Sequence, residues 1–277
     1  MVAGSLHTGH RLSVRRACQA VGLSRAAFDL QGSGGSQRDG PVIEALNAVV
    51  AANSRWGFWK CFDRLRFCGH GWNHKRVHRV YCTLKLNLPR RAKRRLIRPA
   101  QPLLAPAGPN EIWSLDFMSD SLYSGRRFRT LNVLDEGVRE ALAIEIDTSL
   151  PASRVVRTLE RLREWRGLPQ AIRLDNGPEL ISQVMTGRCE QHRIELRYIQ
   201  PGKPDQNAFI ERFNRTYREE VLNAWVFDSL NEVREITEAW IRQYNEERPH
   251  DALGSLPPTV FRERLLAGHN STSKTST

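Results

Sequence analysis

The pattern of apolar residues changes near residue 111, and this change constrains the fold more than any other feature. Before it, apolar residues recur at helical intervals between glycine turns; after it, short strand-like runs alternate with helical segments. The charge changes at the same place. Residues 1–110 hold 19 Lys and Arg against 4 Asp and Glu, whereas residues 111–277 hold 23 against 26. This asymmetry indicates a polyanion-binding arm joined to a domain with another task, with a merely solvated basic surface as the alternative.

Composition excludes several classes of protein. At 277 residues and 40% hydrophobic content, the chain can bury a core, which argues against global disorder. We expect no membrane partner, because no run approaches the roughly 18–20 apolar residues of a membrane helix. The first ten residues lack the features of a signal peptide, which predicts a cytoplasmic location. Five scattered cysteines argue against a disulfide framework.

The first helical region, residues 1–30, has the outline of a helix-turn-helix segment. Ser13 can cap a short helix, Gly22 supplies a turn, and Ser24 can cap a second helix. An ordinary helical hairpin remains the alternative. Residues 31–40 are rich in Gly and Ser and predict a flexible linker, after which Pro41 suits the first turn of the next helix.

Residues 41–88 predict a second helical DNA-binding domain. Its last helix, from Asn73 to Leu84, follows a glycine turn and is cationic, as in helices that enter a major groove. Residues 89–109 then form a basic linker, for which simple solvation is the alternative. The candidate DNA contacts are Lys75, Arg76, Arg79, Arg90, Arg91, Lys93, Arg94 and Arg95. The spacing of Cys61 and Cys68 is too long for a zinc finger, which disfavours structural zinc.

Residues 110–265 predict an α/β domain with a mixed five-stranded sheet and flanking helices. Asp135-Glu136-Gly137 predicts a hairpin turn, and Asn207 can cap a helix that continues through Ala224. Residues 266–277 are expected to be a disordered tail. The expected strands are 111–117, 128–134, 141–146, 171–174 and 196–199, with a helix over 153–165.

Three carboxylates stand out by position. Asp116 lies at or near the end of the first strand, Asp175 at the end of the fourth, and Glu211 in the helix after the loop. Two bare carboxylates about 4 Å apart repel by roughly 4 kcal/mol at an effective dielectric of 20. Divalent cations offset that cost, and oxygen ligands suit Mg²⁺ or Mn²⁺. Two such ions can promote displacement at a phosphodiester. With 26 acids in this part of the chain, the spacing is weak support, and the strand-end positions carry the prediction.

Several motifs together resemble OrfB-type insertion-sequence transposases of the DDE class, which are relatives of retroviral integrases. Asp175 and Glu211 have 35 residues between them, the interval that names the class, and Arg218 follows Glu211 by seven. The motifs are Trp113-Ser114-Leu115-Asp116-Phe117, Leu174-Asp175-Asn176-Gly177-Pro178-Glu179, Gly202-Lys203-Pro204-Asp205-Gln206-Asn207, Glu211-Arg212-Phe213-Asn214, Tyr244-Asn245-Glu246-Glu247-Arg248-Pro249-His250 and Trp72-Asn73-His74-Lys75-Arg76-Val77.

The resemblance implies an RNase H-like fold and a catalytic triad of Asp116, Asp175 and Glu211 that binds two Mg²⁺ ions, with Mn²⁺ as a substitute. Water would free a 3′-hydroxyl at a transposon end, and that hydroxyl would attack a second phosphodiester. The implied partners are double-stranded DNA, as transposon ends and target, and further copies of the chain on that DNA. Lys203 and Arg218 would contact phosphate, and the implied location is the bacterial nucleoid.

Two departures from the family pattern leave questions open. The sequence shows no heptad run, so a fusion with an upstream-frame product of the same element stays an alternative. Gly137-Val138 replaces a bulkier pair, which predicts a looser hairpin. The competing functions are a DNA-binding regulator or transposase derivative without catalysis, and a nuclease of the same fold that cuts without joining.

Overall fold

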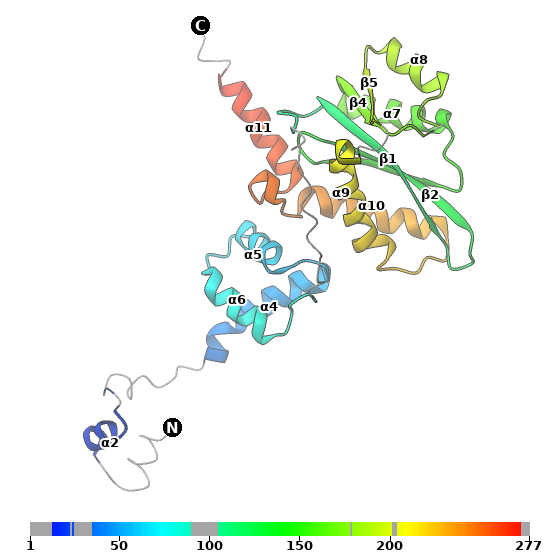
Figure 1. The fold of residues 1–277 in the computed structure, drawn as a ribbon. Coiled ribbons are helices and arrows are strands. Elements are labelled where there is room, and N and C mark those ends of the chain that lie inside the picture. Colours follow the sequence, from blue (N-terminus) through cyan, green and yellow to red (C-terminus); the bar gives the residue numbers. More distant parts are fainter. Residues whose placement is uncertain are drawn as a thin grey trace. The chain divides into compact units, whose positions relative to one another are not determined.

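The computed structural model describes residues 13–22, 24, 35–89, 105–177, 179–200 and 204–272, drawn as ribbon in Figure 1. These residues belong to two compact units. Unit 1 takes residues up to Ser54 together with Gly71–Asn87, and unit 2 takes Arg55–His70 together with the chain from Leu88 onward. The predicted helical domain 41–88 is therefore divided between the two units.

Helix α5, Phe58–Phe67, belongs to unit 2 because its polar side chains bind there. Lys60 Nζ donates to the Pro249 carbonyl at 2.9 Å, and Arg64 pairs with Glu247 at 2.8 Å. Sequence periodicity cannot distinguish which neighbour a helix will pack against, and this explains the wrong boundary.

Three helices of unit 1 are described: α2, Val14–Ala20; α4, Gly35–Ala52; and α6, His74–Thr83. The predicted cap at Ser13 is confirmed, since its side chain accepts from the backbone N–H of Arg16. Asn73 also caps its helix, because its side chain accepts from the backbone N–H of Lys75. Gly22 adopts the predicted turn with φ of +66°. The second helix expected after Ser24 lies outside the described residues.

The start of α4 corrects the predicted linker over 31–40. The helix begins at Gly35, so Pro41 lies inside it and not in its first turn. The turn before Pro41 is held by Asp39, whose buried carboxylate pairs with Arg76 at 3.0 Å and Arg79 at 2.8 Å. Two charge-assisted bonds to one carboxylate favour an ordered helix here over a flexible linker.

Unit 2 contains the predicted mixed sheet, with strand order β3-β2-β1-β4-β5. Strands β1, β2 and β3 pair antiparallel, whereas β4 pairs parallel with both β1 and β5. The strands are β1, Ile112–Ser121; β2, Arg127–Asp135; β3, Ala141–Asp147; β4, Ala171–Leu174; and β5, Glu195–Tyr198. This arrangement confirms the RNase H-like sheet expected from the resemblance.

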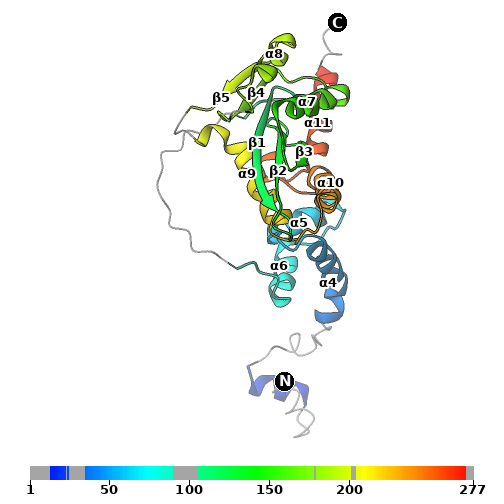
Figure 2. The same ribbon diagram turned by 90° about the vertical axis from the view of Figure 1, so that its right-hand side faces the viewer.

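Helices cover both faces of the sheet (Figures 1 and 2). On one face, α7 (Ala152–Arg166) and α8 (Gln183–Gln191) enclose a core around Trp113 and Ile172. On the other, α9 (Ala208–Tyr217) and α10 (Leu230–Glu246) enclose a second core that includes an apolar stripe along α9 and the turn that follows it. That stripe is Ile210, Phe213, Tyr217 and Val221, all buried.

The hairpin between β2 and β3 is tightly held, so the prediction of a looser hairpin is wrong. A Cβ atom on Gly137 would lie 2.0 Å from the Gly108 carbonyl oxygen, so only glycine fits this close approach. Beside it, the buried Asp135 and Glu140 both accept from Arg166 at 2.9 Å. Close packing of Gly137 against the segment around Gly108 compensates for its small size.

The C-terminal helices differ from the prediction in two respects. Asn207 does not cap α9: its side chain is buried, and a 3-10 turn, Pro204–Asn207, leads directly into the helix. After α9 a π-helical turn, Arg218–Leu222, ends the helical run two residues before Ala224. Helix α11, Pro258–Thr272, extends through the first half of the predicted tail, because each added helical residue gains one backbone bond.

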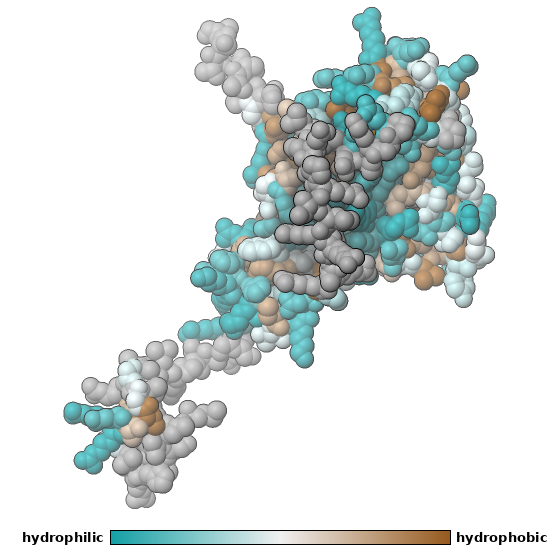
Figure 3. Space-filling view, viewed as in Figure 1, coloured by the Kyte–Doolittle hydropathy of each residue, from teal (hydrophilic) through white to brown (hydrophobic). Residues whose placement is uncertain are grey.

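Within the described ranges, no helix has the length and apolar character needed to cross a membrane. Figure 3 shows that hydrophilic residues cover much of the surface in this view, with hydrophobic residues in smaller areas.

Candidate active site

Asp116 lies in the middle of β1, and not at its end as predicted, because β1 continues to Ser121 in its pairing with β2. Pairing of β1 with β4 stops at Ser114 and Arg173. Asp116 therefore lies just beyond the last residue that pairs with β4, and Asp175 follows β4 by one residue. Continuing the parallel register by two residues sets Asp175 opposite Asp116, on the same face of the sheet.

Helix α9 brings the third carboxylate to that face. The helix contacts β1 and β2, and Glu211 lies in its first turn with an exposed side chain. One turn later on the same helix, the Asn214 amide donates to Asp116 Oδ2 at 2.7 Å. Asn214 in turn accepts from Asn132 of β2 at 2.6 Å. These two asparagines hold Asp116 in place, and α9 is joined to the sheet at the site.

The charges of Asp175 and Glu211 act on Asp116, although burial has the larger effect. The pKa of Asp116 is raised to about 6, chiefly by burial and further by the charges of Asp175 and Glu211. Hydrogen bonds from the Phe117 N–H and from Asn214 act in the opposite direction. Burial and two neighbouring negative charges thus both disfavour the ionised form of Asp116.

No three His, Cys, Asp or Glu side chains in the described ranges are close enough together to hold a metal ion as they stand. The carboxylates of Asp116 and Asp175 each accept a hydrogen bond from a nearby backbone N–H group. Asp116 Oδ1 accepts from its neighbour Phe117, and Asp175 Oδ1 accepts from the Gly177 N–H at 3.0 Å. Repulsion between like charges favours such separate partners when no cation lies between the groups.

A buried chain of polar contacts fixes the start of α9 relative to the strands. The Ser114 hydroxyl donates to Glu136, which is fully buried and pairs with Arg173 at 3.2 Å. Arg173 also donates to the Gln206 carbonyl, in the turn before α9, at 2.9 Å. This series of polar contacts thus joins β1, β4, the β2–β3 hairpin and the 3-10 turn that precedes Glu211.

The loop that carries Asp175 has its own anchor. Glu179 pairs with Arg129 of β2, and this hydrogen bond lowers the pKa of Glu179. Arg129 also lies over the Phe117 ring, 4.4 Å from its centre. Glu179 is therefore engaged in holding the loop.

The candidate DNA contacts are only partly placed. Lys75 is exposed on α6, whereas Arg76 and Arg79 pair with Asp39. Arg218 donates to Asp120 at 3.2 Å and to the Ser119 carbonyl at 2.9 Å, both on β1. Lys203 and the basic linker residues Arg90, Arg91, Lys93, Arg94 and Arg95 lie outside the described residues.

Sequence reasoning missed Asn132, Asn214, Glu136 and Arg173. Asn214 carries a usable signal, because it follows Glu211 by three residues and so lies on the neighbouring helix face. Asn132, Glu136 and Arg173 contribute through contacts with residues distant in the sequence, which no local sequence pattern predicts.

Comparisons with known proteins show the family of this chain. Two models described as integrase core domain match residues 106–204 and 192–258. A protein of the insertion element IS476 from Xanthomonas euvesicatoria is 39% identical over 90% of this chain and 72% of its own length. A protein of the insertion element IS407 from Burkholderia multivorans is 38% identical over 90% of each chain. The chain belongs to the insertion-sequence transposases of the retroviral integrase-like superfamily.

A structural neighbour with low sequence identity is the HTLV-2 integrase catalytic core domain in complex with magnesium. It covers 56% of this chain and 97% of its own, with 18% identity and a TM-score of 0.46. As a member of the transposase family, the chain is a DDE-type enzyme with transposase or integrase-like function.

Proposed function

We propose that this transposase cuts and joins DNA at insertion-sequence ends, with Asp116, Asp175 and Glu211 as its catalytic carboxylates. The observation that carries the proposal is geometric: the β1–β4 register sets Asp175 opposite Asp116, and the bond from Asn214 to Asp116 brings α9, which carries Glu211, to the same place. A protein that only bound DNA would gain nothing from such a cluster, because DNA is itself an anion.

The carboxylates fit divalent metal ions by their chemistry. All three donors are oxygen ligands, which Mg²⁺ and Mn²⁺ prefer. Asp116, Asp175 and Glu211 are the residues that would hold the ions. When bound, the ions neutralise charge on the scissile phosphate and lower the pKa of an attacking hydroxyl or water.

The chain's own residues orient the carboxylates and the helix. Asn214 donates to one oxygen of Asp116 and so leaves the remaining lone pairs of that carboxylate for a ligand. Arg173 fixes the turn that leads to Glu211. Displacement at phosphorus depends on positioning and charge neutralisation, so no protein nucleophile is required.

Double-stranded DNA, as transposon end and target, is the proposed substrate, and further copies of the chain are proposed to assemble on it. Lys75 on α6 is the described residue best placed to contact phosphate, because it is exposed and its neighbours Arg76 and Arg79 are paired. Lys203, Arg218 and the residues 90–95 remain proposed contacts. The proposed location is the bacterial nucleoid.

The decisive experiment is a joining assay with a labelled transposon-end duplex and Mg²⁺. We expect the parent to yield joined product and Asp175→Asn to yield none while still binding the duplex. The matched control is Glu238→Gln, which removes an exposed acid from α10. Joining by Asp175→Asn at the parent rate would refute the assignment. Binding without cutting by the parent would favour a regulator, and cutting without joining a nuclease.

A second experiment tests DNA binding by the helical region in the full chain, because α5 belongs to unit 2 and an N-terminal fragment would lose its contacts. We expect Lys75→Gln to reduce the slope of log affinity against log salt by about 0.9, the value for one phosphate contact. Arg264→Gln, on the exposed side of α11, is the control. An unchanged slope for Lys75→Gln would remove Lys75 from the interface.

A further inference from the structure

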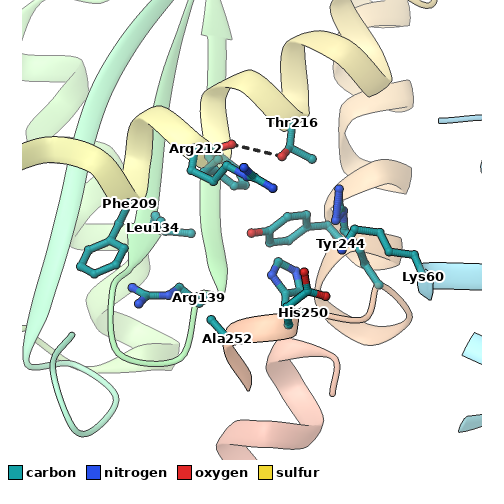
Figure 4. Close-up of a pocket in the computed structure, with 12 residues that line it drawn as sticks. Lys60, Leu134, Arg139, Phe209, Arg212, Thr216, Tyr244, His250 and Ala252 are labelled. Carbon is teal, nitrogen blue, oxygen red and sulfur yellow. Dashed lines mark hydrogen bonds between the residues drawn. The ribbon is translucent and has the colours of Figure 1, made fainter. Parts of the chain in front are cut away.

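Unit 2 contains a cavity of about 280 Å³ beside α9 (Figure 4). Helix α9 contributes residues at intervals of three and four, whereas Glu211 lies on a neighbouring face of that helix. The lining residues from α9 are Phe209, Arg212, Phe213 and Thr216; those from other segments are Lys60, Leu134, Arg139, Tyr244, Arg248, His250, Asp251 and Ala252.

Cations dominate the polar lining of this cavity. Lys60, Arg139, Arg212 and Arg248 line it, against the single carboxylate of Asp251. Burial and the charge of Arg248 lower the pKa of Lys60 to about 8, although its ammonium donates to the Pro249 carbonyl. Four cations around one small space repel one another, and an anion between them would reverse that repulsion.

The guanidinium groups of Arg248 and Arg139 are held by other contacts within unit 2. Arg248 donates to Glu220 at 2.7 Å, and Arg139 donates to the Glu136 carbonyl and lies 3.5 Å from the centre of the Phe209 ring. These contacts fix the position of each group and leave further N–H groups of the guanidinium unused. The site is therefore preorganised, which reduces the entropic cost of binding.

Two buried nitrogen atoms at the cavity have no hydrogen-bond partner among the described residues: Arg248 Nε and His250 Nε2. Arg248 is only 8% exposed. Burial and the surrounding cations hold the pKa of His250 well below its usual value, so its imidazole is neutral and one ring nitrogen can donate. An unsatisfied buried polar group costs about 1–3 kcal/mol, and a ligand with several acceptors would satisfy both atoms.

We propose that this cavity binds a phosphate group, held by Arg212, Arg248 and His250 with Lys60 and Arg139 nearby. A tetrahedral oxyanion presents several acceptors within a small volume, which matches several convergent N–H donors in a cavity of this size. The group can be a free phosphate or a phosphodiester of DNA, and both present the same oxygens. This site is separate from the carboxylates and does not depend on their proposed role.

The first arm of the test uses inorganic phosphate with the full chain. We expect a saturable increase in melting temperature with phosphate, compared with sodium chloride at equal ionic strength. Arg212→Gln should weaken the fitted affinity about tenfold, the loss expected for one charge-assisted bond. Arg242→Gln, which removes an exposed cation from α10, is the matched control and should bind as the parent does. Equal phosphate affinity in the parent and Arg212→Gln would overturn the proposal.

A second variant guards against indirect effects. His250→Gln keeps a neutral side chain of similar length and should also weaken phosphate binding, with an unchanged melting temperature in chloride alone. The second arm uses a 20-base-pair duplex. If the phosphate belongs to DNA, inorganic phosphate competes with the duplex and Arg212→Gln lowers the salt slope of binding. If the ligand is a free phosphate, Arg212→Gln leaves duplex binding unchanged and weakens only the phosphate affinity.

Discussion

Helix α9 separates two sites of opposite charge. One of its faces carries Glu211 toward Asp116 and Asp175, where three acids gather; another carries Arg212 into a cavity lined by four cations. In both sites like charges are brought together and partly buried, which is unfavourable for the protein alone. Each site would therefore be stabilised by a ligand of the opposite sign, and this is the basis of the two proposals: metal ions at the carboxylates and a phosphate group among the cations.

The largest effect that would test this comparison is expected at Asp116. Asp116→Asn keeps the size of the side chain and removes its charge, so we expect strand joining to fall by a factor on the order of a thousand or more. The measurement is single-turnover joining of a labelled end at saturating Mg²⁺. Activity within tenfold of the parent would show that this carboxylate holds no essential ion.

The second prediction tests how much Arg248, which lines the cavity, contributes to the stability of the fold. Arg248→Met removes one partner of a buried ion pair and leaves Glu220 with Trp240 as its remaining donor. We expect a loss of about 3 kcal/mol in the free energy of unfolding, measured in urea. The double variant Arg248→Met with Glu220→Gln should recover much of it. A small loss in the single variant would mean that Arg248 serves ligand binding with little structural role.

The pH dependence of stability tests the environment of Asp116 without any substrate. In metal-free protein, the pKa of Asp116 is about 6 when folded and near 3.8 when unfolded. The folded state then binds more protons between these values, so stability falls as pH rises from about 4 to 6 and stays reduced above. Asp116→Asn removes this cost and should be more stable than the parent at pH 7 by about 2 kcal/mol. The difference should vanish near pH 4.

The smallest expected effect concerns the amide that orients Asp116. Asn214→Ala leaves every carboxylate in place but removes the bond to Asp116 Oδ2. Partners of metal ligands typically contribute a factor of about ten to a hundred in metal affinity, and we expect the lower value here. Titration of joining activity with Mg²⁺ measures it. An unchanged Mg²⁺ requirement would assign Asn214 to the packing of α9 alone.

Much of unit 2 could be predicted because its signals are local. The strand-like runs and the apolar stripe of α9 depend on the period of the side chains, and both are confirmed. The prediction that Asp116 lies near the end of its strand was wrong. The end of a strand depends on how far its partner extends, and β2 pairs with β1 over a longer stretch than β4 does.

The unpredicted parts depend on contacts between distant residues. Asp39 holds α4 through arginines more than 35 positions away, and Gly137 is explained only by the carbonyl of Gly108. The cavity was not predicted either, because its cations come from four separate segments of the chain. The catalytic triad itself stays a prediction, supported by the electrostatics of Asp116.

The assignment of α5 to unit 2 has a consequence for the history and engineering of this chain. The polypeptide passes between the units after residues 54, 70 and 87. A recombination event at only one of these points would separate α5 either from the residues of unit 2 that it contacts or from the adjoining segments of unit 1. Exchange of unit 1 between related transposases therefore requires that α5 be inherited with unit 2, through three coordinated junctions.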